Sequence, residues 1–295
     1  MKKYIVITGG AGFIGSNLIE SLLSNTRYHL ISIDDYSAGS INNHLKSKRV
    51  KYLKLHTKDI NVALNKYAKK IDVIFHFGEF SRITQSFIDK SKCFKSNIIG
   101  SYEVINFCLK HKIKIIYSAT SASLGNNGED GHLSPYAFSK YNNMNFIINL
   151  ATWFDLKYEI IYFYNVFGPK QLTKTKMSAV IGIFEDHYKK NKSLPVVLPG
   201  TQTRRFTHVK DTVDACIMAW KNNKNAHYAV INKKSYTINE LAKLFSKNIK
   251  FVPKRLGERF ESKVLKSIRG RKINNIFTKN RVREYVEEIK SLNER

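Results

Sequence analysis

Short apolar runs alternate with helical patterns over the first half of the chain. The apolar run Tyr4–Thr8 is typical of a strand buried on both faces of a parallel sheet. Ile14, Leu18 and Leu22 then recur at helical spacing, and a second apolar run ends at Asp34. The alternation continues through Val50–Leu55, Val73–Phe77, Val104–Leu109, Ile113–Tyr117, Tyr141–Leu150 and Glu159–Tyr164. This alternation predicts an α/β fold with a doubly wound parallel sheet.

The pattern changes after Gly168-Pro169. Longer polar loops then separate helical patterns at Met177–Tyr188, Asp211–Trp220 and Asn239–Phe245. We therefore predict a first domain over residues 1–168 and a smaller C-terminal α/β domain over residues 169–295. No repeat or low-complexity linker separates the two, so we expect an interleaved boundary.

The composition indicates a globular protein with a strong positive charge. The chain has 295 residues, 43% of them hydrophobic, which is enough to bury a substantial core. Lysine and arginine outnumber acidic residues by 50 to 23, so the formal net charge is +27. Either the partner is anionic or the composition is biased, since lysine and asparagine are spread along the whole chain. Without an arginine-rich block or basic stripe, anionic small molecules are favoured and nucleic acid is not.

The cysteine content and the hydropathy pattern indicate the cellular compartment in which the protein works. Cys93, Cys108 and Cys216 are far apart and form no disulfide set, which fits a reducing environment. The first apolar run is too short for a signal peptide, and no stretch approaches about 18 apolar residues. We expect a soluble, cytoplasmic protein with no membrane partner. The histidines, His76 and His208 among them, lack metal-ligand spacing, so no metal site is expected.

A glycine-rich turn joins the first predicted strand to the first helix. It reads Gly9-Gly10-Ala11-Gly12-Phe13-Ile14-Gly15. Its glycines permit a sharp turn close to a pyrophosphate, which the helix N-terminus stabilises. Asp34 follows about 20 residues later, where a carboxylate accepts hydrogen bonds from the adenosine ribose and repels a 2′-phosphate. The pattern favours NAD over NADP, with Asp35 as a rival for this position; the alternatives are an ordinary tight turn and a solvated strand end.

Tyr136 and Lys140 stand four residues apart at the start of a predicted helix, so their side chains share one face. A phenol with a pKa near 10 is a poor base at neutral pH, but a neighbouring ammonium group lowers that pKa. Tyr136 would then act as general base for a hydroxyl proton. The upstream run Ser118–Ser121 would place hydroxyl groups beside the same substrate oxygen. The alternative is a surface Tyr/Lys pair.

Together these motifs resemble the extended short-chain dehydrogenase/reductase family, the NAD-dependent nucleotide-sugar epimerases and dehydratases. The resemblance spans nearly the whole chain and keeps the order of the family motifs. It rests on Thr8–Gly15, Asp34-Asp35, Lys58-Asp59-Ile60, His76-Phe77-Gly78, Asn97–Ser101, Ser118–Ser121, Tyr136 with Lys140, Asn165–Pro169 and Arg204–Asp211. The resemblance implies a Rossmann-type sheet, NAD as cofactor, a nucleotide-diphosphate sugar as substrate and a homodimer.

The resemblance also implies roles for individual residues. Catalysis would fall to Tyr136, Lys140 and Thr120, with Thr120 assisting the tyrosine. Cofactor binding would involve Gly9, Gly12, Phe13, Ile14, Gly15, Asp34, Asp35, Asp59, Ile60, Phe77, Gly78, Asn97 and Lys140, with Asp59 and Ile60 at the adenine. Substrate binding would involve Asn165, Arg204 and Arg255. Apart from the resemblance, Ser118 and Glu79 are candidates for substrate contact because of their own positions in the sequence. The two arginines would bind the diphosphate, a task suited to a guanidinium fork, or would be solvated loop charges.

Three departures from the family pattern bear on the reaction. Ser121-Ala122 follows Thr120, where the 4,6-dehydratases of the family usually have Asp-Glu as acid and base. Glu79 stands where the family has Ala or Gly, and it would either contact the substrate or pair with Arg82. Arg205 replaces the usual Asp. These departures put the identity of the sugar in question and leave the redox residues in place.

We therefore predict an NAD-dependent nucleotide-sugar 4-epimerase, in which C4 is oxidised transiently and the hydride returns to the opposite face. The nearest alternative is a nucleotide-sugar 4-dehydrogenase or 4-ketoreductase on the same core, followed by a 4,6-dehydratase. The non-enzyme alternatives are an NAD-binding sensor and a nucleic-acid-binding module. Intact Tyr136, Lys140 and Thr120 argue against a silent sensor, and a nucleic-acid module requires salt-sensitive binding.

Overall fold

The computed structural model describes residues 2–123, 132–268 and 270–293. Within these ranges one large sheet contains the strands β1 (Tyr4–Thr8), β2 (His29–Asp34), β3 (Val50–Lys54), β4 (Ile71–His76), β5 (Lys114–Thr120), β6 (Tyr158–Phe163), β11 (His227–Asn232), β14 (Ser267–Ile268) and β15 (Arg271–Thr278). Their order across the sheet is β14-β15-β11-β6-β5-β4-β1-β2-β3. All neighbours are parallel except β14 and β15.

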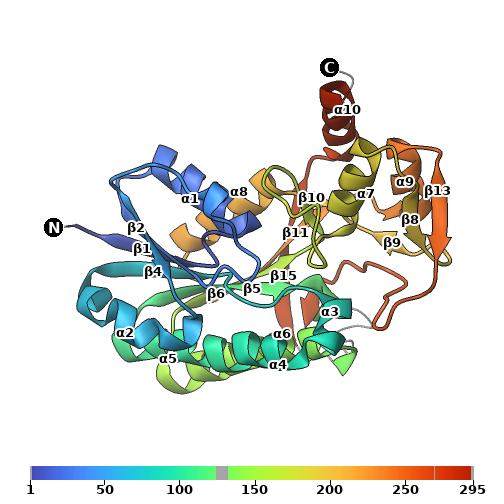
Figure 1. Cartoon of the computed structure of the whole chain (residues 1–295). Coiled ribbons are helices and arrows are strands. Elements are labelled where there is room, and N and C mark those ends of the chain that lie inside the picture. The colour runs from blue at the N-terminus through green and yellow to red at the C-terminus, as the bar shows by residue number, and fades with distance from the viewer. Residues whose placement is uncertain (1, 124–131, 269, 294–295) are drawn as a thin grey trace.

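Helices cover both faces of this sheet (Figure 1). On one face lie α1 (Phe13–Asn25) and α8 (Val209–Lys221), whose apolar side chains share a core with β1 and β4. On the other face lie α2 (Ile60–Leu64), α5 (Ser101–His111) and α6 (Pro135–Phe154), which bury a larger core. This two-sided cover confirms the predicted doubly wound α/β sheet of Rossmann type.

After residue 168 the chain alternates between the sheet and a second core. β11 and β15 join the sheet, whereas other segments pack around buried side chains that include Phe184, Leu241 and Val286. These segments are α7 (Val180–Lys189), α9 (Ile238–Phe245), α10 (Val282–Asn293), β8 (Leu194–Val197) and β13 (Ile249–Val252). Two small pairings lie nearby, β7 (Val166–Phe167) with β10 (Thr207–His208) and β9 (Thr203–Arg204) with β12 (Tyr236–Thr237). The division into residues 1–168 and 169–295 stays our proposal.

Shorter helical segments connect these elements. On the α6 side of the sheet lie α3 (Ile83–Ile88) and α4 (Lys90–Phe94), which are in contact with α6. The others are the 3-10 turns at Ile41–Asn43, Thr57–Asp59, Asn65–Lys70 and Ser121–Ser123 and a π-helical turn at Lys95–Gly100.

The start of α6 is determined by local sequence. The Ser134 side chain accepts a hydrogen bond from the Ala137 backbone N–H at 3.0 Å, and Pro135 occupies the first turn. Both are strong helix-start signals, because they satisfy or remove a backbone donor that has no partner within the helix. Tyr136 and Lys140 consequently fall on the first two turns of α6, next to the carboxyl end of β5.

The direction of strand addition reverses at β1. From β1 the chain adds β2 and β3 on one side, and β4, β5 and β6 on the other. In open α/β sheets, ligands bind in the crevice outside the carboxyl ends of the strands at such a switch point. The loops after β1 and β4 are therefore expected to border a binding site.

Candidate active site

A cleft begins at this switch point and extends to the second core. The glycine turn and the end of β2 line its first part, Thr120 and Tyr136 line its middle, and Arg204 and Arg255 line its far end. Residues from Gly9 to Ser262 thus meet in one cavity. This arrangement suits two ligands, a phosphate-rich cofactor at one end of the cleft and a second phosphorylated molecule at the other.

The glycine turn has the close packing that a dinucleotide requires. Gly9 has φ +69°, and a Cβ there would lie 2.8 Å from the Gly78 nitrogen. At Gly15 a Cβ would lie 2.2 Å from the Gly9 carbonyl oxygen. Gly12 caps α1 without a side-chain hydrogen bond, and Phe13 and Ile14 line the cleft at the first turn. The helix N-terminus therefore faces the cleft with backbone N–H groups that fit a pyrophosphate.

Asp34 and Asp35 both line the cleft beside this turn. The Asp34 carboxylate is 8% exposed and accepts hydrogen bonds from the Ala11 N–H at 3.0 Å and the Tyr36 N–H at 2.8 Å. Burial raises the pKa of Asp34, and these backbone donors oppose that rise. Asp35 accepts only a local bond from the Ser37 N–H at 2.9 Å among the hydrogen bonds described. Asp34 is thus the better anchored of the two carboxylates.

The loop after β4 packs against the glycine turn at the same end of the cleft. Phe77 and Gly78 line the cleft, and their backbone N–H groups donate to the Thr8 hydroxyl oxygen at 3.1 and 3.0 Å. Asn97 is fully buried and does not line the cleft. Its side chain accepts from the Phe80 N–H at 2.6 Å and donates to the Phe80 carbonyl at 3.0 Å. The buried Asn97 side chain therefore anchors the loop after β4 through its two hydrogen bonds with the Phe80 backbone.

The predicted adenine residues lie behind the cleft wall. Ile60 is fully buried in the core under α2, and Asp59 precedes it at the helix start; neither lines the cleft. The lining residues here are Leu55, His56 and Thr57, which follow β3 directly. Sequence reasoning missed these three, although their position after the carboxyl end of a strand was an available signal.

Tyr136 and Thr120 come together in the middle of the cleft. Thr120 ends β5 and Tyr136 lies on the first turn of α6. Burial raises the pKa of Tyr136 to about 12, and a hydrogen bond with the Thr120 side chain counteracts part of this rise. Arg82, also in the cleft lining, lowers the same pKa through its positive charge. Sequence reasoning did not assign Arg82 to the site, and its Nε donates to the Met177 carbonyl oxygen.

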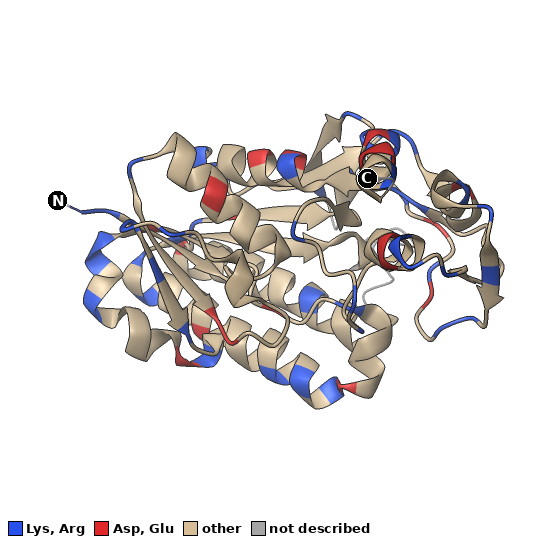
Figure 2. Cartoon of the chain, turned by 45° about the horizontal axis from the view of Figure 1, so that its top comes forward, with Lys and Arg blue, Asp and Glu red and all other residues tan. Residues whose placement is uncertain are grey.

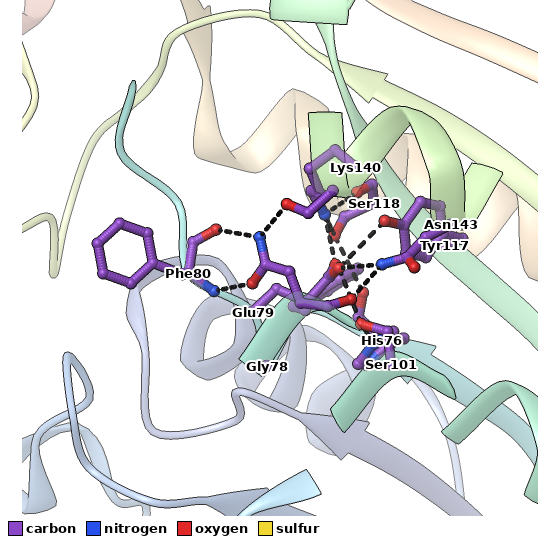
Figure 3. Close-up of polar contacts among 12 residues, drawn as sticks. His76, Gly78, Glu79, Phe80, Ser101, Tyr117, Ser118, Lys140 and Asn143 are labelled. Carbon is purple, nitrogen blue, oxygen red and sulfur yellow. Dashed lines mark hydrogen bonds and ion pairs between the residues drawn. The ribbon is translucent and has the colours of Figure 1, made fainter. Parts of the chain in front are cut away.

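Lys140, and not Arg82, is the ion-pair partner of Glu79 among the described contacts, and Glu79 also lines the cleft. The Lys140 ammonium donates to Glu79 Oε2 and to the Ser118 carbonyl oxygen, and it lies 3.2 Å from Ser118 Oγ (Figure 3). It also stands 4.6 Å above the centre of the Tyr117 ring. Burial lowers the pKa of Lys140, and the Glu79 charge opposes that change. Arg82 makes no ion pair with Glu79 among the described contacts.

The far end of the cleft carries the expected arginines. Arg204 Nη2 lies 2.6 Å from Glu258 Oε1, and its side chain is 16% exposed. It is therefore a buried, paired cation, unlike the solvated charge that was the alternative. Arg255 lines the cleft as an exposed side chain, and Asn165 lines it while donating to the Arg205 carbonyl at 3.1 Å. Arg205 lies outside the lining and donates to backbone carbonyls.

Residues 2–123, 132–268 and 270–293 contain no group of three or more His, Cys, Asp or Glu side chains arranged to hold a metal ion. Within the same part of the chain, no helix is both long enough and apolar enough to span a bilayer.

Comparison with known proteins shows which family this chain is similar to. Residues 5–232 match the profile of the NAD dependent epimerase/dehydratase family. A Methanocaldococcus jannaschii protein with the provisional name UDP-glucose 4-epimerase is 29% identical over 257 residues, covering 84% of this chain and 83% of its own. UDP-glucuronic acid decarboxylase 3 of Arabidopsis thaliana is 27% identical over 256 residues, covering 81% and 72% of the two chains.

A solved structure extends the similarity to the whole fold. UDP-N-acetylglucosamine 4-epimerase from Methanobrevibacter ruminantium, in complex with UDP-N-acetylmuramic acid, superposes with a TM-score of 0.83 at 26% identity. The match covers 99% of this chain and 100% of that one. The family match covers most of the chain and confirms the predicted enzyme class and NAD as its cofactor. This chain belongs to the NAD dependent epimerase/dehydratase family, within the extended short-chain dehydrogenases/reductases.

Proposed function

We propose that the protein is a nucleotide-sugar 4-epimerase that oxidises and re-reduces C4 of its substrate. One observation carries this proposal. Tyr136, Thr120 and Lys140 converge between a glycine cradle at one end of the cleft and the arginines at the other. A sugar whose diphosphate lay on Arg204 and Arg255 would present its ring to the phenol of Tyr136. The names of the relatives favour UDP as the nucleotide, so UDP-hexoses are the first substrates to test.

The residues divide the work of the reaction. Gly9, Gly15 and Asp34 would hold NAD, which supplies the hydride acceptor and donor when bound. Tyr136 removes the proton from the C4 hydroxyl while its phenol is aligned by Thr120. The resulting 4-keto sugar must turn over and accept hydrogen on its other face. The paired cation Arg204 restrains the diphosphate while the ring moves.

A 4,6-dehydratase is less well supported by the same cleft. That reaction needs an acid and a base near C5 and C6, and the positions after Thr120 are Ser121 and Ala122. Both line the cleft, but neither side chain has a pKa suited to the task. A 4-dehydrogenase or 4-ketoreductase remains the nearest rival. Each candidate UDP-hexose should be incubated with enzyme and NAD, since an epimerase inverts C4 without net reduced-nicotinamide absorbance.

Replacing Tyr136 with phenylalanine tests the assigned base. We expect turnover to fall by at least about 100-fold, because general base catalysis contributes that much or more. NAD affinity measured by calorimetry should stay near the wild-type value, since the phenol is assigned to the substrate. Normal turnover in Tyr136→Phe would refute this mechanism.

The remaining expectations concern assembly and location. Homodimer formation and a cytoplasmic site are proposals, and light scattering on the purified chain tests the first. The charged side chains give little support to a nucleic-acid partner, because lysine and arginine are dispersed over helices and loops of both parts (Figure 2). A salt-sensitive gel shift at physiological ionic strength would revive that alternative.

A further inference from the structure

Glu79 is the centre of a buried polar cluster that the family pattern does not include. Its side chain is only 2% exposed. Oε1 accepts hydrogen bonds from Ser101 Oγ at 2.9 Å and from Tyr117 Oη and Asn143 Nδ2, both at 3.1 Å. Oε2 accepts from the Lys140 ammonium (Figure 3). Protein donors engage both oxygens, so Glu79 is held within the fold at the lining of the cleft.

The direction of each hydrogen bond in this cluster follows from which groups can donate and which can accept. Ser101 Oγ donates to Glu79, so its second contact, with His76 Nε2 at 2.8 Å, must be a bond that it accepts. His76 therefore carries its proton on Nε2, and Nδ1 accepts from the Thr8 hydroxyl at 2.7 Å. Burial lowers the pKa of His76 to about 4, which keeps the ring neutral. A directed chain thus runs from β1 through β4 and α5 to the carboxylate.

We propose that Glu79 is a positioning residue that holds the Lys140 ammonium and determines how much of its positive charge reaches the Tyr136 phenol. This inference rests on the proposed function of Tyr136 as the base. An ammonium in direct contact with a buried carboxylate forms a nearly neutral pair, so its field at a third group is weak.

The other groups that face Tyr136 make the sign of the effect clear. Glu79 and Cys93 raise the pKa of the phenol, whereas Arg82 and the Thr120 side chain lower it. Tyr117, from β5, interacts with both Glu79 and Tyr136, and its own pKa is raised well above the usual value. Burial raises the pKa of Cys93 to about 11, so the thiol is neutral near pH 7. Glu79 is therefore the anion to remove.

The test is Glu79→Gln, read as the alkaline titration of Tyr136. The phenolate absorbance of each protein is corrected by its Tyr136→Phe counterpart, so that the other tyrosines cancel. We expect the midpoint to fall by about 1 pH unit, because Glu79 raises the pKa of the phenol through its negative charge and its neutralisation also leaves the Lys140 ammonium unpaired. Glu79→Asp keeps the negative charge, but its side chain is shorter by one methylene group, so the carboxylate lies further from Lys140. The Tyr136 midpoint of this variant should lie between those of Glu79→Gln and the wild type.

A matched control separates this effect from a loss of packing. Glu159 is another fully buried carboxylate, 3.3 Å from Lys114 and on the same sheet. Glu159→Gln should cost comparable stability and leave the Tyr136 midpoint unchanged. An unshifted or raised midpoint in folded Glu79→Gln overturns the proposal. If circular dichroism shows that this variant does not fold, Glu79→Asp decides alone, and an unchanged midpoint overturns it.

The titration needs no substrate, so it distinguishes this inference from the epimerase assignment. A lowered midpoint without any epimerase activity would support the role of Glu79 and remove the proposed function. With activity present, the pH profile of kcat in Glu79→Gln should shift toward lower pH by a similar amount. Epimerase activity with an unchanged midpoint would support the proposed function and overturn the role of Glu79.

Discussion

Replacing Gly15 with alanine tests whether the glycine turn holds the dinucleotide. A Cβ at residue 15 would lie 2.2 Å from the Gly9 carbonyl oxygen and 2.8 Å from the Gly10 Cα. Both are backbone atoms, so no side-chain rotation relieves the contact. The start of α1 must move away by about 1 Å to restore ordinary van der Waals distance.

This displacement has two measurable consequences. Overpacking costs about 1–3 kcal/mol, and the higher helix propensity of alanine offsets at most about 1 kcal/mol. A net loss of about 1–2 kcal/mol lowers Tm by roughly 2–8 °C. The shift would also move the first turn of α1 away from a pyrophosphate bound at this turn. Loss of one hydrogen bond to a charged group costs about 1.5–3 kcal/mol, so NAD affinity should fall at least about ten-fold.

The two effects are separated by a control with the same clash elsewhere. At Gly182 in α7, an added Cβ would also lie 2.2 Å from a backbone carbonyl oxygen, that of Leu172. Circular dichroism should show a lower Tm for both alanine variants. Calorimetry should show weakened NAD binding for Gly15→Ala alone. Wild-type NAD affinity in Gly15→Ala, or equal weakening in Gly182→Ala, would refute the assignment of the turn.

Three further outcomes follow from the structure. Arg204→Ala should raise KM for the nucleotide sugar about ten-fold or more, since bonds from a guanidinium to phosphate are charge-assisted; an equal change in NAD affinity would argue against its placement. Ser134→Ala should cost about 1 kcal/mol in urea unfolding, because the Ala137 N–H loses its cap. Burial lowers the pKa of both His76 and His227 from 6.5 to about 4. Their stabilisation is therefore complete above pH 6.5 and is lost as pH falls toward 4, by about 2 kcal/mol for each ring at pH 5. Equal unfolding free energies at pH 7 and pH 5 would contradict this.

Local sequence determined much of the fold and part of the site. The apolar run Tyr4–Thr8 became β1, and Asp34 ends β2 as its spacing from the glycine turn predicts. The four-residue spacing placed Tyr136 and Lys140 on one helix. Each of these features depends on residues a few positions apart, for which periodicity and turn chemistry suffice.

Strand pairing over long separations was beyond that reasoning. β11 and β15 lie in the region that read as loops and helices, yet they extend the sheet beside β6. The segment after β3 shows the same limit over a shorter span, because Leu55, His56 and Thr57 line the cleft while Ile60 turns into the core. Which residues after a strand reach the cleft depends on how the next helix packs.

Only the tertiary structure decided what the charged groups do. Glu79 and Lys140 are 61 residues apart and meet because β4 and β5 are parallel neighbours and α6 packs beside them. Arg204 and Glu258 are 54 residues apart and likewise meet only in the folded chain. The energy of a charge depends on its burial and its partners, and both are properties of the assembled fold. The sequence by itself thus determined which chemical groups are available and in which order, and three-dimensional packing determined which of them are paired and which face the cleft.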